Sequence, residues 1–220
     1  MASNPASGSH ALHHGPAHLQ HHFVDSNQQF ESSKMGMWIF LVTEILFFGG
    51  LFLAYIVYRS WYPDLYTAAS EELNTLWGAV NTLVLIGSSL TVAMAIRSAQ
   101  LNQQKGIVIN LAITIALACV FMVIKYFEYS HKFHIGILPG ENYTYTGIDH
   151  PKANIFFSIY YMMTGLHGVH VIIGIGLMIW LLVKARAGAF SSEYYTPVEI
   201  TGLYWHLVDV IWIFLFPLLY

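Results

Sequence analysis

The chain has 220 residues, of which 56% are hydrophobic and 10% are charged, and its formal net charge is −3 at pH 7. Soluble proteins average about 25% charged residues, so this composition indicates an integral membrane protein with no separate soluble core. The few basic residues form no cluster, which argues against a nucleic-acid partner. Cys119 is the only cysteine, which excludes an internal disulfide and a CxxC centre, and its apolar surroundings predict a small core residue.

Residues 1–33 contain no Lys or Arg and are rich in small and polar residues. A signal peptide needs a basic n-region, so we interpret this stretch as a flexible, His-rich N-terminal tail. Such a tail has no fixed geometry for a metal, although metal or partner binding stays open as the alternative. Its histidines are His10, His13, His14, His18, His21 and His22.

Residues 35–58 form an apolar run that contains a single charged residue, Glu44. As a helix the run is ~36 Å long, enough to cross a ~30 Å hydrocarbon core, with Glu44 near its middle. A carboxylate at that depth costs ~2.5–3.5 kcal/mol, so Glu44 is predicted to be functional. The alternative is a neutral Glu44 that hydrogen-bonds to a neighbouring helix as a packing contact.

Apolar runs predict four further spans, over residues 73–96, 106–124, 153–183 and 200–220, of which only the last contains a charged residue, Asp209. The predicted fold class is therefore all-α, a multi-pass transmembrane bundle of five helices over residues 34–220. Residues 59–72 and 132–152 are predicted to be loops. Basic residues near the span ends favour an inner N-terminus and an outer C-terminus. The inner set is Lys34, Arg97, Lys105, Lys184 and Arg186, and the outer set is Arg59, Lys132 and Lys152.

The third span continues into a polar end that contains Lys125, Glu128 and His131. Lys125 and Glu128 are three residues apart and can pair on one helix face, while the lysine can also extend toward the interface. Glu128 and His131 form an E-x-x-H motif, which is half of a di-iron signature. A second copy is absent from the sequence, so no di-metal site is predicted.

The last two spans contain His167 and His170, predicted to lie on one side of their helix, and His206 with Asp209. A histidine beside Glu44 would form a proton relay, because histidine titrates near neutral pH. His167 or His170 could instead ligate a haem together with His206, in a haem-binding membrane anchor. The third interpretation is hydrogen bonding between helices. A self-contained soluble-type catalyst is not predicted, and the missing inverted repeat argues against an independent transporter.

Several segments, in this order, resemble subunit III of haem-copper oxidases, the cytochrome c oxidase type included, and the resemblance covers residues 34–220. The matching segments are Gly36-Met37, Thr43-Glu44, Phe47-Phe48, Glu128-Tyr129, Thr164 to Gly174, Glu199 and Tyr204 to Trp212. The chain resembles the short five-span form of the family. It lacks the two N-terminal spans of many members, whose cleft holds lipid, and Lys125 stands where a neutral residue such as Gln is expected.

The resemblance implies a non-catalytic accessory subunit of a proton-translocating terminal oxidase in aerobic electron transport. Such a subunit packs beside subunit I and supports proton uptake and sustained turnover. It carries no haem or copper of its own, the haems and copper lie in partner subunits, and phospholipid binds in the family. The implied setting is a bacterial inner membrane, with membrane lipid and a larger respiratory supercomplex as further partners. The implied polar, proton-linked residues are Glu44, Glu128, His167, His170, Glu199, His206 and Asp209.

Overall fold

The computed structural model describes residues 19–20, 23–140, 143–148, 150 and 152–220. Six helices lie in these ranges: α1 (Ser26–Trp61), α2 (Pro63–Glu71), α3 (Thr75–Gln100), α4 (Gln104–His134), α5 (Ala153–Arg186) and α6 (Thr196–Leu219). All of them except α2 are long and apolar enough to cross a membrane. The prediction of an all-α bundle with five transmembrane helices is confirmed.

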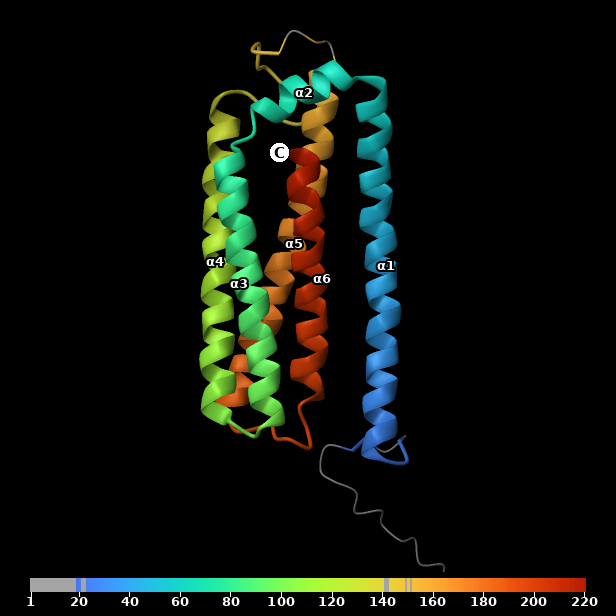
Figure 1. Ribbon diagram of the computed structural model, residues 1–220, viewed down its shortest axis with the longest axis vertical. Helices are drawn as coiled ribbons and strands as arrows, with labels where there is room; N and C mark the ends of the chain where they lie inside the picture. Colours follow the sequence, from blue (N-terminus) through green and yellow to red (C-terminus); the bar gives the residue numbers. More distant parts are fainter. Residues whose placement is uncertain (1–18, 21–22, 141–142, 149, 151) are drawn as a thin grey trace, which may run out of the picture.

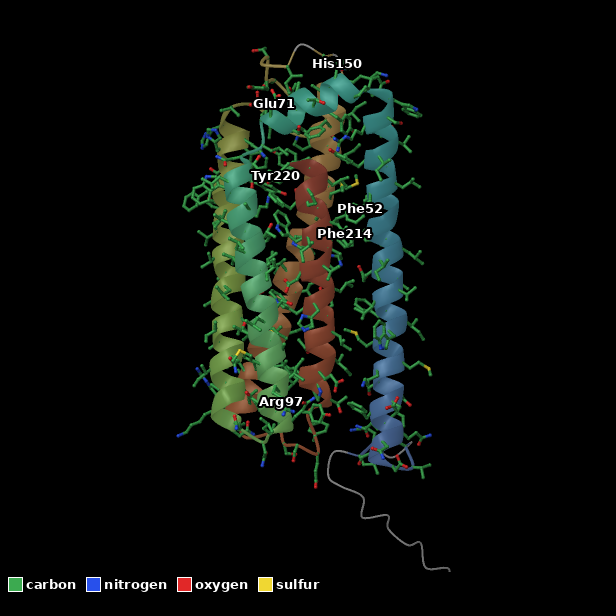
Figure 2. The ribbon with its side chains drawn as sticks, in the orientation of Figure 1. Phe52, Glu71, Arg97, His150, Phe214 and Tyr220 are labelled. Atoms are coloured by element: carbon green, nitrogen blue, oxygen red, sulfur yellow. The ribbon has the colours of Figure 1, made fainter. Side chains whose placement is uncertain are left out.

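The long helices run roughly parallel and antiparallel to one another (Figure 1). Helices α3, α4, α5 and α6 form the bundle, and α1 packs against α5 and α6. The short helix α2 lies across one end, which we call the α2 end. Figure 2 shows Glu71 and His150 at this end and Arg97 at the opposite end. The end of α4, the starts of α3 and α5, and the end of α6 therefore meet near α2.

Side-chain caps fix where two of the long helices begin. The Asp25 carboxylate accepts a hydrogen bond from the backbone N–H of Gln28 at 2.7 Å, at the start of α1. The Asn74 side chain accepts from the backbone N–H of Leu76 at 3.1 Å, at the start of α3. Both satisfy N–H groups that have no partner within the first helical turn.

Two tryptophans join α6 to α3 through the bundle interior. The Trp205 indole N–H donates to the Ser88 hydroxyl at 3.0 Å, and the Trp212 indole N–H donates to the Thr82 hydroxyl at 3.0 Å. Both rings are fully buried. Gly174 lets α5 approach them, because a Cβ at this position would lie 2.5 Å from the Trp205 ring. A small residue at a helix crossing is a common solution in membranes.

The structure differs from the sequence prediction at the ends of elements. Helix α1 begins at Ser26, inside the predicted tail, and the predicted loop 59–72 contains α2, whose first residue is Pro63. Helix α4 continues to His134, so Lys132 belongs to a helix rather than a loop. Cys119 is exposed on the surface of α4, and its prediction as a core residue was wrong because apolar helices expose apolar faces to lipid. The six tail histidines lie outside the described residues.

Candidate functional site

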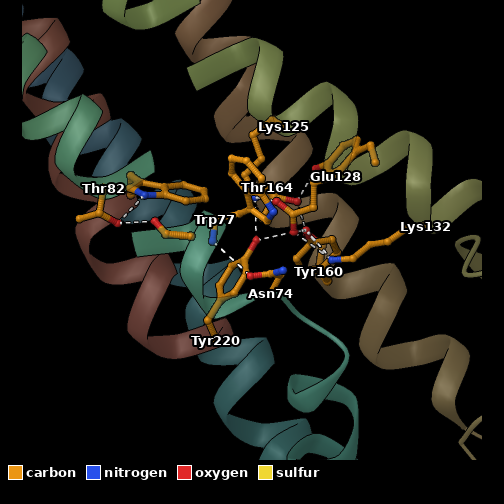
Figure 3. Close-up of polar contacts among 12 residues, drawn as sticks. Asn74, Trp77, Thr82, Lys125, Glu128, Lys132, Tyr160, Thr164 and Tyr220 are labelled. Atoms are coloured by element: carbon orange, nitrogen blue, oxygen red, sulfur yellow. Dashed lines mark hydrogen bonds and ion pairs between the residues drawn. The ribbon is translucent and has the colours of Figure 1, made fainter. Parts of the chain in front are cut away.

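The most extensive polar contacts of the described chain surround Glu128 of α4, inside the α2 end of the bundle. Its carboxylate is 2.9 Å from the Lys125 ammonium and 3.0 Å from the Lys132 ammonium. The Tyr160 hydroxyl of α5 donates to it at 2.7 Å, and the Tyr220 hydroxyl that follows α6 donates at 2.5 Å. Figure 3 shows these side chains converging. We call these five residues the Glu128 cluster.

The cluster is nearly closed to its surroundings. The side chains of Lys125, Glu128 and Lys132 are exposed by only 9%, 7% and 4%. Each ammonium also donates to a phenol oxygen, Lys125 to Tyr220 at 2.8 Å and Lys132 to Tyr160 at 3.1 Å. Because the Glu128 carboxylate accepts four hydrogen bonds, the cluster compensates a charge that would otherwise be costly to bury.

Sequence reasoning predicted the pairing of Lys125 with Glu128, which the structure confirms. The extension of Lys125 toward the interface was wrong, since its ammonium points inward, 4.6 Å from the centre of the Trp212 ring. Lys132, Tyr160 and Tyr220 were missed as members. Residues 125, 128 and 132 fall at helical spacing, so extending the helix by one residue beyond His131 would have found Lys132. The tyrosines carry no such signal, because they come from other helices.

A second polar contact joins α1 to α5. The His170 Nε2 atom lies 3.0 Å from a carboxylate oxygen of Glu44, and the His170 Nδ1 atom lies 2.8 Å from the backbone oxygen of Leu166. A carbonyl oxygen can only accept, so Nδ1 carries a proton. The hydrogen bond at Nε2 therefore holds one proton, either on the imidazole or on the carboxyl group. The hydrogen bond between Glu44 and His170 is compatible with both predictions for Glu44, a proton relay and a hydrogen-bonded packing contact.

The Glu44–His170 pair is more accessible than the Glu128 cluster. Its side chains are exposed by 17% and 15%, and they line a groove of about 380 Å³ between α1, α5 and α6. Met37, Phe40 and Tyr204 also line this groove. The Phe48 ring packs edge-on against His170 at 5.3 Å between ring centres and shields one side of the pair.

His167 and His170 do not share an environment, although they are three residues apart. His167 is fully buried, with its ring 5.6 Å from the Phe121 ring and 5.3 Å from the Trp212 ring. Neither of its nitrogens has a hydrogen-bond partner among the described residues. His167 thus faces α4 and α6, whereas His170 faces α1. The two histidines were predicted to lie on one side of α5, but in the structure they contact different helices.

The remaining predicted residues lie on α6. The His206 Nδ1 atom is 2.6 Å from the Ser89 hydroxyl of α3. Asp209 is buried near the same serine and has no ion-pair partner among the described residues. Glu199 pairs with Lys34 of α1 at 3.2 Å, in a partly exposed position. The structure therefore distributes the seven predicted residues over several separate places rather than one site.

No group of three metal-ligating side chains occurs within the described ranges. Each histidine considered for a haem also has a different neighbour: ring side chains for His167, Glu44 for His170 and Ser89 for His206. Ligating a haem through a pair of them would require breaking these contacts.

A model of the family described as cytochrome c oxidase subunit III matches residues 17–220. The chain belongs to this family. It is an integral membrane protein, as its five apolar helices already indicate. The resemblance found from the ordered motifs is thereby confirmed.

Individual relatives carry the same description. A protein of Synechocystis sp. named cytochrome c oxidase subunit 3 is 34% identical over 207 residues, which are 94% of this chain and 80% of that protein. The protein of the same name from Thermostichus vulcanus is 34% identical over 84% of this chain and 85% of its own length. A probable quinol oxidase subunit 3 of Staphylococcus epidermidis is 31% identical, covering 86% of this chain and 89% of that protein. These names do not favour the haem-binding anchor.

Proposed function

We propose that this chain is the accessory subunit III of a terminal haem-copper oxidase, and that it packs beside subunit I. In this role it supports proton uptake and sustained turnover, while the haems and copper belong to partner subunits. Family membership supports the assembly. The observation that carries the proton-linked role is the Glu44–His170 hydrogen bond, set within apolar helices and beside a groove.

The pair can exchange a proton without a large movement of either helix. The His170 ring is held through Nδ1 by the Leu166 carbonyl, so Nε2 faces Glu44 whichever group carries the proton. The groove beside the pair leaves Glu44 and His170 accessible between α1 and α6. A carboxyl and an imidazole in contact can take up and release one proton in this way.

We further propose a bacterial inner membrane, with the N-terminus inside and the C-terminus outside. The buried ion pair of Lys132 supports this orientation, because a paired lysine inside the bundle does not count as a loop charge. Removing it from the outer set leaves Arg59 and Lys152. The inner side then has five basic residues and the outer side has two, instead of five and three.

The test is purification of the chain from its native membrane in mild detergent, with mass spectrometry of the co-purifying proteins and a reduced-minus-oxidised spectrum. We expect a haem-copper subunit I in the preparation and no haem absorption from the separated chain. A chain that purifies without subunit I would contradict the proposal. A b-type spectrum from the folded, separated chain would restore the membrane-anchor alternative.

A further inference from the structure

A polar contact lies at the outer surface of the bundle, between α3 and α6 and halfway along both. The His206 Nδ1 atom of α6 is 2.6 Å from the Ser89 hydroxyl of α3, and both side chains are partly buried. Each residue lies close to the midpoint of its helix, α6 (Thr196–Leu219) or α3 (Thr75–Gln100). The midpoint of a helix that crosses a membrane lies deep in the hydrocarbon core.

The second ring nitrogen of His206 is available to a group outside the chain. Nδ1 and Nε2 point in different directions, so Nε2 is directed away from the Ser89 hydroxyl. Across the part of the chain that the structure describes, Nε2 has no hydrogen-bond partner and is not fully enclosed. In either tautomer it is a donor or an acceptor of a hydrogen bond. Hydrocarbon satisfies neither role, and an unpaired polar group is costly at this depth.

Two other polar side chains at the outer faces of the spans have partners within the chain. The Thr43 hydroxyl, at an exposed position of α1, donates to the Phe40 backbone oxygen of the same helix at 2.6 Å. His170 uses both of its nitrogens, on the Leu166 backbone oxygen and on Glu44. The imidazole between α3 and α6 differs from both, because only one of its nitrogens is engaged.

Apolar side chains surround His206 on the outer surface of the two helices. They are Ile86 and Leu90 of α3 and Val210 and Ile213 of α6, which are 43% to 62% exposed. The spacings of three or four residues place each set on one side of its helix. We call these four residues and His206 the α3–α6 face. Helix α6 packs against α3 on one side and α1 on the other (Figure 1), so this face is separate from the groove beside Glu44.

We propose that the α3–α6 face binds a transmembrane helix of another oxidase subunit, which places a hydrogen-bonding side chain opposite His206 Nε2. The proposal rests on the proposed function, because an accessory subunit buries one of its faces against the complex. A lipid acyl chain would cover the apolar side chains but offers the imidazole no partner. A lipid headgroup lies at the membrane surface, far from the helix midpoint. A polar side chain on an apolar helix satisfies both parts of the face.

Photo-crosslinking in the native membrane tests the location of the contact. Photoreactive benzoylphenylalanine replaces Val210 of the α3–α6 face or, as the control, Val169 of α5, which is 50% exposed and lines a different groove. The oxidase is then purified, and the adducts are identified by mass spectrometry. We expect a several-fold higher yield of an adduct with another oxidase subunit from position 210 than from position 169.

The outcomes separate this proposal from the proposed function. Lipid adducts alone at position 210, in an oxidase that retains the chain, would overturn the α3–α6 face as the contact and leave the accessory role intact. An adduct with a second copy of the chain would also overturn it. A preparation that contains no other oxidase subunit would overturn both proposals.

Substitutions test the role of Nε2. His206→Leu removes the imidazole, His206→Gln keeps a hydrogen-bonding side chain, and Ser89→Ala removes the contact within the chain but keeps Nε2. The dissociation constant of the chain from the oxidase is measured by dilution in mild detergent, and circular dichroism checks that each variant is helical. We expect His206→Leu to raise the dissociation constant about three- to tenfold, the usual contribution of a hydrogen bond between membrane helices.

The two other variants should stay close to the wild type. Equal dissociation constants for His206→Leu and the wild type would overturn the role of Nε2. Equal weakening by Ser89→Ala and His206→Leu would also overturn it, because His206 would then act through its contact within the chain.

Discussion

The Glu128 cluster and the Glu44–His170 pair are both buried polar contacts between apolar helices, but they differ in how completely they are satisfied. Glu128 has four donors from three different parts of the chain, and its side chain is 7% exposed. Glu44 has one hydrogen-bond partner among the described residues, is 17% exposed and lines a groove. A fully satisfied network stabilises one arrangement of helices, whereas a pair with one shared proton can change its protonation state. We infer a structural role for the cluster and a proton-exchanging role for the pair.

The largest expected effect is on stability at the cluster. Glu128→Gln leaves the ammonium groups of Lys125 and Lys132 buried without a compensating charge, and this typically costs about 3–5 kcal/mol. We expect that loss in the free energy of unfolding, measured by denaturant titration in mild detergent. Glu71→Gln, at an exposed position of α2, is the control. A loss below about 1 kcal/mol would show that the cluster is not the main polar support of the bundle.

A smaller loss is expected when one donor is removed from the same cluster. Tyr160→Phe deletes the hydroxyl that donates to Glu128 and accepts from Lys132, and a hydrogen bond to a charged group contributes about 1.5–3 kcal/mol. The same titration measures the effect, with Tyr126→Phe at a 70% exposed position of α4 as the control. If both variants unfold alike, the Tyr160 hydroxyl contributes nothing to the cluster.

Glu44→Gln distinguishes the Glu44–His170 pair from the Glu128 cluster, because it should change proton exchange but not stability. The glutamine keeps a hydrogen bond to His170 but cannot exchange a proton, so we expect a stability change within about 1 kcal/mol. The assembled oxidase should keep its spectrum and lose activity after several-fold fewer turnovers. Glu31→Gln, exposed on the same helix, should behave as the wild type. An unchanged turnover lifetime would remove the proton-linked role of Glu44.

The smallest effect is expected at the Lys34–Glu199 ion pair, which joins α1 to α6 in a partly exposed position. Such pairs contribute about 0–1 kcal/mol because water and salt screen them. Lys34→Ala should therefore lower the unfolding free energy no more than Lys105→Ala at an exposed position. A larger loss for Lys34→Ala would mean that α1 depends on this contact rather than on packing against α5 and α6.

The sequence by itself determined the membrane class, the five spans and the family. Each of these follows from local information: the length of an apolar run, the rarity of charges within it, and the order of short motifs around Glu44, Glu128 and His170. The Lys125–Glu128 pair is also local, because residues three apart meet on one face of a helix. The ends of the elements were less predictable. Residues 59–72 were predicted to be a loop, but they contain α2, because a proline such as Pro63 is equally compatible with a turn and with the first position of a helix.

Only the tertiary structure decided which polar residues meet. His170 is close to Glu44 and His167 is not, although both belong to one motif, because the rotation of α5 presents one to α1 and the other to α4 and α6. The tyrosines of the Glu128 cluster come from α5 and the end of α6, at sequence separations that no helical period connects. In a membrane the helices form from their own hydrogen bonds, so sequence indicates each helix separately. Their rotations and offsets are set by packing between helices, which decides the sites.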